Sequence, residues 1–111
     1  MIKIRKAEIK DCRQVYELCR VPGLVNPSGE PPKIWWIESF IKEKQMFYVA
    51  ETNKDIIGFV IGERTCGNLG YLWMLAIKKE FQGKGLGKKL LKLAERECRR
   101  RKLKAIICYG F

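Results

Sequence analysis

Three glycines spaced two residues apart, Gly83, Gly85 and Gly87, stand where an apolar run ends and an amphipathic pattern begins. Glycine adopts backbone conformations that other residues avoid, and it lets a ligand approach the main chain closely. The first N–H groups of a helix have no intrahelical acceptors and lie at the positive end of its dipole. Such a turn is typical of sites that hold a diphosphate. The spacing therefore predicts a phosphate-binding loop between a strand and a helix.

Two common phosphate-binding motifs do not fit this spacing. The dinucleotide pattern G-x-G-x-x-G requires a glycine where Lys88 stands. The Walker pattern G-x-x-x-x-G-K-[ST] requires a glycine at the place of Gln82 and a hydroxyl at the place of Lys89. What remains is a Q-x-x-G-x-G motif that begins at Gln82.

The composition limits the class of protein. The 111 residues fit one domain, residues 1–111, with a core of limited size. A net charge of +11 favours anionic ligands, such as a phosphorylated cofactor or a nucleic acid. The five cysteines form no C-x-x-C pair and the chain has no histidine, so we expect reduced thiols in the cytoplasm and no metal site. We expect no membrane association, because no apolar run is long enough to span a bilayer and no signal peptide is visible.

Hydrophobic patterning predicts the elements that position the glycine loop. Residues 1–11 are expected to hold a first strand and then Asp11, which we expect to cap a short helix with Gln14 as its capping-box partner. The segment from Val21 to Lys33 holds all four prolines and is expected to be irregular. A second helix follows, and its adjacent residues Trp35 and Trp36 cannot share one stripe: either one packs against the sheet and the other faces a substrate cleft, or both pack in the core. The elements expected in order after the irregular segment are a helix (34–44), strands 46–51 and 56–62, a strand that opens at Tyr71, a helix with an apolar stripe (Leu86, Leu90, Leu93, Ala94 and Cys98) and a strand (105–109).

In this setting the Q-x-x-G-x-G motif resembles the signature of the GNAT superfamily of acyl-CoA-dependent N-acetyltransferases, Q/R-x-x-G-x-G/A. Residues 1–11, 46–51 and 56–62 resemble the first three strands of that family in the same order, so the resemblance covers most of the chain. It implies an α/β (α+β) fold with a mixed, mostly antiparallel sheet flanked by helices. The fourth and fifth strands are expected to be parallel, on either side of a crossover helix.

The resemblance implies an enzyme that transfers an acetyl group from acetyl-CoA to a primary amine of a protein or small molecule, by direct attack in a ternary complex. The N–H groups from Gly83 to Lys88 would bind the diphosphate, and the pantetheine arm would lie along the fourth strand. The backbone N–H of Leu75 would donate to the thioester oxygen. The expected cofactor-binding residues are Leu75, Ala76, Ile77, Gln82, Gly83, Lys84, Gly85, Leu86, Gly87 and Lys88.

Acid–base chemistry is less well defined by the sequence. Without histidine, the base must be a carboxylate, a tyrosinate or a water chain, and Glu63 is our candidate among several carboxylates. At neutral pH about a tenth of an α-amine is uncharged, against well under a thousandth of a lysine side chain. A site without a strong base therefore favours an α-amine or another amine of low pKa. Cys66 and Cys108 are poor nucleophile candidates, since no histidine activates them.

The sequence departs from the family after the fifth predicted strand. Full-length members continue with a helix and two strands, and that helix carries a tyrosine that protonates the departing thiolate. Here the chain ends at Phe111, and Tyr109 is the candidate acid. An apolar edge strand is a liability that proteins normally cover, so we expect a homodimer.

Two alternatives remain open at this point. One is a CoA-binding module without turnover. The other is a nucleic-acid-associated protein that uses the basic cluster between Arg96 and Lys104. Cations also stabilise the C-terminal end of a helix by about 0.3–1 kcal/mol, so a solvated helix end explains the same cluster.

Overall fold

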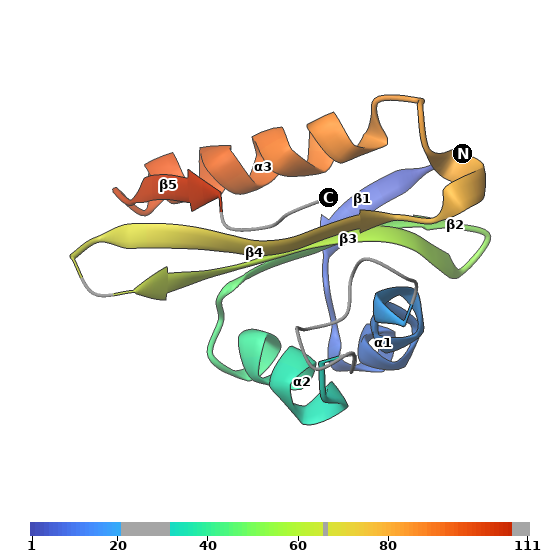
Figure 1. Cartoon of the computed structure of the whole chain (residues 1–111), viewed down its shortest axis with the longest axis horizontal. Coiled ribbons are helices and arrows are strands. Elements are labelled where there is room, and N and C mark those ends of the chain that lie inside the picture. The colour runs from blue at the N-terminus through green and yellow to red at the C-terminus, as the bar shows by residue number, and fades with distance from the viewer. Residues whose placement is uncertain (21–31, 66, 108–111) are drawn as a thin grey trace.

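A computed structural model describes residues 1–20, 32–65 and 67–107, which form a five-stranded sheet with helices on both faces (Figure 1). The elements are β1 (Lys3–Lys6), η1 (Ile9–Asp11), α1 (Cys12–Cys19), α2 (Ile34–Lys42), β2 (Met46–Thr52), β3 (Asp55–Thr65), β4 (Leu69–Ile77), η2 (Lys79–Phe81), α3 (Leu86–Arg100) and β5 (Lys104–Ile107).

The strands follow the order β1-β2-β3-β4-β5 across the sheet. Neighbours among the first four strands pair antiparallel, and β5 pairs parallel with β4 after the chain returns through α3. Helices α1 and α2 cover one face of the sheet, and α3 covers the other (Figure 1). The predicted α/β fold, with antiparallel strands flanked by helices, is confirmed.

The core consists of two apolar layers, one on each face of the sheet. On the α3 face, the predicted helix stripe is buried at Leu86, Leu90, Ala94 and Cys98, whereas Leu93 is half-buried. On the other face, α1 and α2 pack against Phe59 and its neighbours, with Val15 and Ile37 fully buried. Each large apolar side chain buried in this way contributes about 1.5–3 kcal/mol.

The hairpin between β3 and β4 is longer than the sequence predicts. The stretch between the predicted strand 56–62 and the one predicted to open at Tyr71 includes Thr65 and Leu69, which pair across the two strands, so the turn is shorter. Gly70 lies inside β4, where it pairs with Arg64, and a side chain would not fit there because a Cβ would stand 2.7 Å from the Cys98 sulfur. Helix α2 also ends earlier than predicted, at Lys42.

The two adjacent tryptophans of α2 differ in exposure. The Trp36 ring packs edge-on against Phe40, with 4.7 Å between the ring centroids. The Trp35 side chain is 66% exposed and lies outside the pocket described below.

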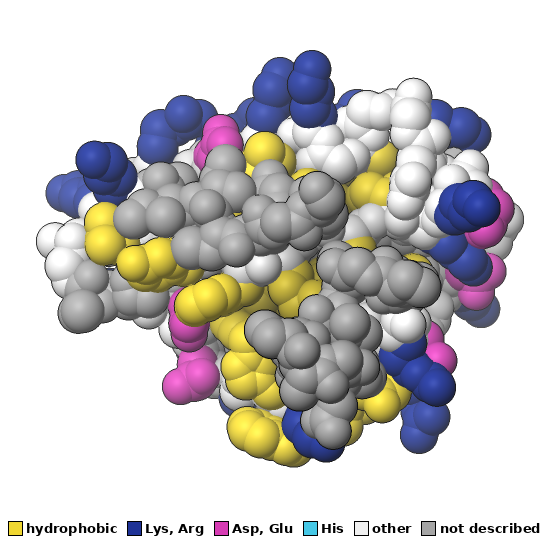
Figure 2. All heavy atoms as spheres, viewed as in Figure 1, with side chains coloured by type: hydrophobic (Ala, Val, Ile, Leu, Met, Phe, Trp, Pro, Cys, Tyr) yellow, Lys and Arg dark blue, Asp and Glu magenta, His cyan; other side chains and the backbone are white. Residues whose placement is uncertain are grey.

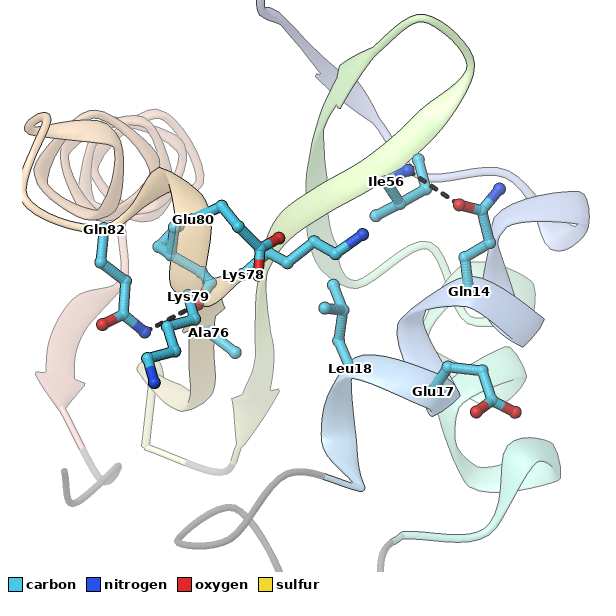
Figure 3. Close-up of a pocket in the computed structure, with 10 residues that line it drawn as sticks. Gln14, Glu17, Leu18, Ile56, Ala76, Lys78, Lys79, Glu80 and Gln82 are labelled. Carbon is cyan, nitrogen blue, oxygen red and sulfur yellow. Dashed lines mark hydrogen bonds between the residues drawn. The ribbon is translucent and has the colours of Figure 1, made fainter.

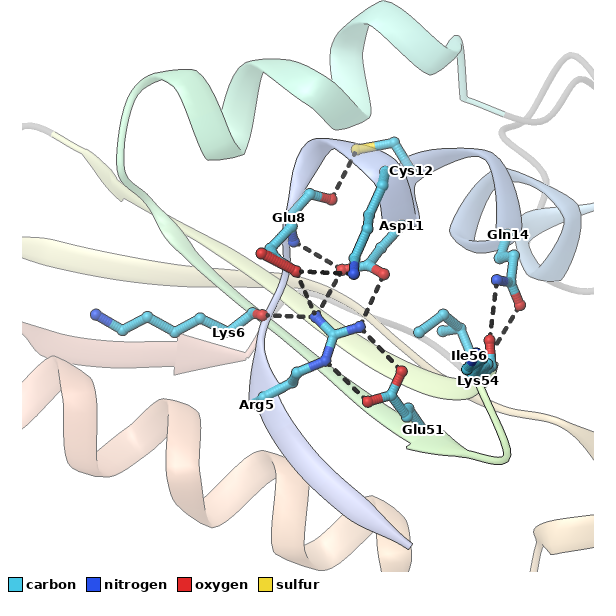
Figure 4. A network of polar contacts seen from close by, with 10 residues as sticks. Arg5, Lys6, Glu8, Asp11, Cys12, Gln14, Glu51, Lys54 and Ile56 are labelled. Atoms are coloured by element: carbon cyan, nitrogen blue, oxygen red, sulfur yellow. Dashed lines mark hydrogen bonds and ion pairs between the residues drawn. The ribbon is translucent and has the colours of Figure 1, made fainter.

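Asp11 stands at the predicted N-cap position of α1, but the predicted capping-box bonds are not formed there. Asp11 makes no side-chain cap bond to α1, because a guanidinium from β1 occupies its carboxylate. Arg5 donates from Nη1 and Nη2 to the two Asp11 oxygens at 2.8 and 2.9 Å, and the Glu8 N–H adds a third bond at 2.7 Å (Figure 4). Arg5 also pairs with Glu51 of β2, so a single guanidinium joins β1, β2 and the start of α1.

Gln14, the expected capping partner, points to the β2–β3 hairpin instead (Figure 4). Its Oε1 accepts from the Ile56 N–H at 2.8 Å, and its Nε2 donates to the Lys54 carbonyl at 3.4 Å. The capping box is formed one turn earlier by Glu8 and Asp11 at η1. Burial by itself would raise the pKa of Asp11, but the Arg5 hydrogen bonds and the Glu8 N–H lower it to below its ordinary value.

Candidate cofactor and acceptor site

The glycine loop between η2 and α3 has the backbone shape that its residues require. Gly83 and Gly85 have φ values of 80° and 78°, in the left-handed region where other residues are strained. Gly85 is the N-cap of α3, and its carbonyl accepts the N–H of Lys89 at 3.1 Å. Gly87 lies inside the first turn of α3 with a negative φ, so its backbone conformation does not require glycine.

This loop presents a row of unpaired backbone donors. Among the residues that the structure describes, the N–H groups from Gly83 to Lys88 have no hydrogen-bond acceptor. No side chain caps the N-terminus of α3 either. Six N–H groups beside the positive end of a helix dipole can hold an anionic group such as a diphosphate.

Strand β4 leads into this loop with one edge unpaired. β5 pairs with β4 only from Leu69 to Leu72, opposite Lys104 to Ile107. Beyond Leu72, within the described ranges, β4 has β3 on one side and no strand on the other. A register shift lies at the same place: Gly62 pairs with Leu72 but Ile61 pairs with Met74, which leaves Trp73 as the bulged residue.

The pairing of β3 and β4 shows which backbone groups face the open edge. The Lys78 N–H donates to the Ile57 carbonyl at 2.7 Å, so these two residues form a hydrogen-bonded pair. Backbone groups alternate in direction along an antiparallel strand, so the amide of Ala76 also faces β3. The N–H and C=O groups of Leu75 and Ile77 therefore point to the unpaired edge.

Gln82 braces the loop against this edge. Its Nε2 donates to the Ile77 carbonyl at 2.9 Å, which links the end of β4 to the residue before the glycines. This contact agrees with the outward direction of the Ile77 carbonyl. The Gln82 side chain, predicted to bind the cofactor, thus makes a contact within the protein that fixes the position of the loop.

A pocket of about 650 Å³ lies between α1 and the end of β4 (Figure 3). This volume is typical of small-molecule sites. The lining residues are Gln14, Glu17, Leu18, Ile56, Ala76, Ile77, Lys78, Lys79, Glu80 and Gln82. Three of them, Ala76, Ile77 and Gln82, are among the cofactor-binding residues predicted from the sequence. Lys78 and Lys79 were missed; the signal that would have found them is two adjacent cations directly after the strand.

The candidate base, Glu63, lies apart from Leu75. It stands on β3 three residues from Val60, the partner of Leu75, which corresponds to about 10 Å along the strand. Its Oε1 accepts the indole N–H of Trp73 at 2.7 Å. Tyr71 and Trp73 stack with 5.5 Å between ring centroids. Trp73 was not predicted as a site residue from the sequence. The candidate acid, Tyr109, lies outside the described residues.

Basic side chains lie along the outer surface of α3 (Figure 2). Lys88, Lys89, Lys92, Arg96 and Arg99 are exposed. Further along, Glu97 accepts bonds from its helix neighbours, so part of the predicted basic cluster is engaged within the helix. The guanidinium of Arg100, then that of Arg101, lowers the pKa of Glu97 to about 2.

The described thiols do not fit nucleophilic chemistry. Burial raises the pKa of Cys12 to about 11 and that of Cys19 to about 12, which keeps both protonated at neutral pH. Cys108 lies outside the described residues, as does Cys66. Within the described ranges, no three histidine, cysteine or acidic side chains gather as metal ligands, and no helix has the length and apolarity to cross a bilayer.

Comparison with known proteins agrees with the family resemblance found in the sequence. Residues 9–110 match the model of the Acetyltransferase (GNAT) family. An uncharacterized N-acetyltransferase of Methanocaldococcus jannaschii is 45% identical over 49 residues, which are 44% of this chain and 31% of that protein. Because the family model matches nearly the whole chain, the chain belongs to the GNAT acetyltransferase family.

Solved structures share the fold. Ard1 from Thermoplasma volcanium superposes with a TM-score of 0.76 at 20% identity, over 92% of this chain and 66% of that chain. The putative acetyltransferase yncA from Salmonella typhimurium, solved with its cofactor acetyl-CoA, superposes with a TM-score of 0.82 at 20% identity, over 98% of this chain and 70% of that chain. The chain therefore spans less than two thirds of the length of the Methanocaldococcus and Thermoplasma proteins.

Proposed function

We propose that this member of the GNAT acetyltransferase family transfers an acetyl group from acetyl-CoA to a primary amine, which attacks the thioester directly in a ternary complex. The observation that carries the proposal is the continuity of two sets of backbone donors. The unpaired edge of β4 runs directly into a loop whose N–H groups are free. An elongated donor with a diphosphate in its middle fits both sets at once.

The loop would hold the diphosphate. Six N–H groups, from Gly83 to Lys88, are available, and a hydrogen bond to a charged acceptor contributes about 1.5–3 kcal/mol. Lys84 and Lys88 stand beside these donors and add positive charge. Lys78 and Lys79 line the adjoining pocket and increase the attraction for an anion.

The open edge of β4 would hold the arm of the donor. Leu75 and Ile77 present backbone groups away from β3, so an extended amide-containing arm pairs with them as an added strand would. The Gln82 side chain already occupies the Ile77 carbonyl, which leaves the Leu75 groups and the Ile77 N–H for this purpose.

The Leu75 N–H would also polarise the thioester carbonyl. A fixed donor aimed at a developing oxyanion typically contributes about 2.7–4 kcal/mol of transition-state stabilisation. Because β4 bulges at Trp73 and its pairing with β5 ends at Leu72, the Leu75 N–H has no acceptor on a neighbouring strand among the described residues.

The acceptor is proposed to be an amine that loses its proton easily. Glu63 is about 10 Å along the strand from Leu75, so proton removal there would require intervening water molecules. An α-amine needs less help than a lysine side chain because its pKa is lower by more than two units. Tyr109 is the proposed acid that protonates the departing thiolate.

The test combines binding and turnover. Calorimetry with CoA measures the first, and mass spectrometry of a peptide and amine panel incubated with acetyl-CoA measures the second. Acetylated product above the uncatalysed background supports the proposal. CoA binding with no product from any amine would make the chain a non-catalytic CoA-binding module, and absence of CoA binding would refute both functions.

A further inference from the structure

An aromatic pair and a carboxylate lie on the β3–β4 hairpin, on the face opposite α3. Leu72 packs in the core layer beneath α3, so its neighbour Tyr71 projects from the other face. Trp73, at the bulge, lies beside Tyr71, because the two rings stack and its indole N–H binds Glu63. Glu63 stands directly opposite Tyr71 in the strand register. Tyr71 and Trp73 stack at an interplanar angle of 23°, and 37% of Trp73 is exposed. The three side chains form one surface cluster, here called the hairpin cluster.

The carboxylate of the hairpin cluster is oriented but not neutralised. The Trp73 indole N–H binds Glu63 Oε1 at 2.7 Å and fixes its position. In the described part of the chain, no lysine or arginine lies within ion-pair distance of Glu63, although the sequence contains 23 such residues. A half-buried carboxylate beside two aromatic rings attracts a cation both by charge and through the faces of the rings.

The position of the hairpin cluster relates it to the open edge of β4. Trp73 is the bulged residue, two positions before Leu75, or about 7 Å along the strand. Glu63 is three residues along β3 from Val60, the partner of Leu75, or about 10 Å by the same measure. A cation held here would therefore lie roughly 7–10 Å from an amine that reacts beside Leu75.

We infer that Glu63, Tyr71 and Trp73 bind a cationic group of the acceptor, so that the enzyme prefers amines carrying a second positive charge. This inference rests on the function proposed above. The substrate class that fits the spacing is a peptide with a free α-amine and a lysine or arginine as its second residue. The local negative charge offsets the repulsion that a chain of net charge +11 exerts on such a substrate.

The first experiment measures a ratio of specificity constants. Tripeptides that differ only at the second residue, lysine or the isosteric neutral norleucine, are compared by kcat/KM. We expect about a tenfold preference for lysine, from the combined size of an exposed cation–π contact and an exposed ion pair. Glu63→Gln and Trp73→Leu should each reduce the ratio toward one. A diamine and a monoamine of equal length show whether a small molecule gains the same preference.

A matched control separates cation binding by Glu63 from a role of Glu63 as a base or in folding. Glu95→Gln on α3 makes the same change in charge at a half-buried carboxylate away from the hairpin, and it should leave the ratio unchanged. If Glu63→Gln lowers kcat/KM for both peptides equally, Glu63 acts as a base or in folding and the inference is wrong. An unaltered ratio in Glu63→Gln would overturn it as well.

A second readout does not depend on turnover. In a ¹H–¹⁵N spectrum the indole signal of Trp73 is assigned by its loss in Trp73→Leu. Titration with lysine amide should shift this signal in the wild type but not in Glu63→Gln, and norleucine amide should shift it in neither. A shift without acetylation of any amine would refute the proposed function while supporting the cation site; acetylation without a shift would do the reverse.

Discussion

Replacing Gly85 with alanine should damage the loop far more than the same change at Gly87. The two glycines are two residues apart in one motif but differ in conformation. Gly85 has a φ of 78°, and a Cβ there would meet nothing within 4 Å. A Cβ on Gly87 would make ordinary contacts of 3.8 Å with side chains of β4, and its φ is not in the left-handed region.

The sizes of the two effects follow from these conformations. An L-residue in the left-handed region costs about 1–2 kcal/mol, and no steric term is added at Gly85 because the space is open. Alanine in place of glycine within a helix gains about 0.5–1 kcal/mol, which applies to Gly87 in the first turn of α3. The two variants should therefore differ by about 1.5–3 kcal/mol in the free energy of unfolding.

Urea denaturation followed by tryptophan fluorescence measures the stability, and calorimetry measures the affinity for CoA. If Gly85→Ala relieves its strain by turning one N–H away from the diphosphate, the affinity for CoA should fall about tenfold. Gly87→Ala should bind CoA as the wild type does, which agrees with the alanine that the family signature admits there. Equal loss of affinity in both variants, or a Gly85→Ala variant as stable as the wild type, would refute the reasoning.

Three further changes test other contacts. Asp11→Asn should lower the free energy of unfolding by about 3 kcal/mol, the lower end of the range for a broken buried pair because Glu51 still binds Arg5; a loss below 1 kcal/mol in urea denaturation would contradict this. Because the pKa of Glu97 is lowered to about 2 from 4.5, its stabilising effect is present above pH 4.5 and lost as the pH falls toward 2, so wild type and Glu97→Gln should converge in stability over that interval. Gln82→Ala removes an exposed hydrogen bond, so we expect a several-fold weaker affinity for CoA by calorimetry with nearly unchanged stability, and unchanged affinity would argue against a bracing role.

Much of the fold is predictable because its signals are local. The apolar stripe of α3 has the helical period, and four of its five predicted members are buried. Strands β2 and β3 were predicted from short runs rich in β-branched and aromatic residues. The ends of β3 and β4 were not predicted, since the pairing of Thr65 with Leu69 depends on the register of the two strands.

The errors arise where distant residues compete for a side chain. Asp11 and Gln14 have the spacing of a capping box, yet Arg5 binds the first and Ile56 the second. Arg5 itself reaches Glu51, 46 positions away in the chain. No local pattern distinguishes a free cap from one that a partly buried cation already holds.

The sequence by itself determined the glycine loop of this protein. Left-handed φ angles exclude most residues, so the need for them is recorded directly in residue type at Gly83 and Gly85. Tertiary structure alone decided that β5 leaves β4 after Leu72, that Trp73 forms a bulge and that Leu75 turns its N–H to the open edge. The physical reason is that strand register depends on which residues pair across the sheet, and a shift of one residue reverses the direction of every backbone donor that follows.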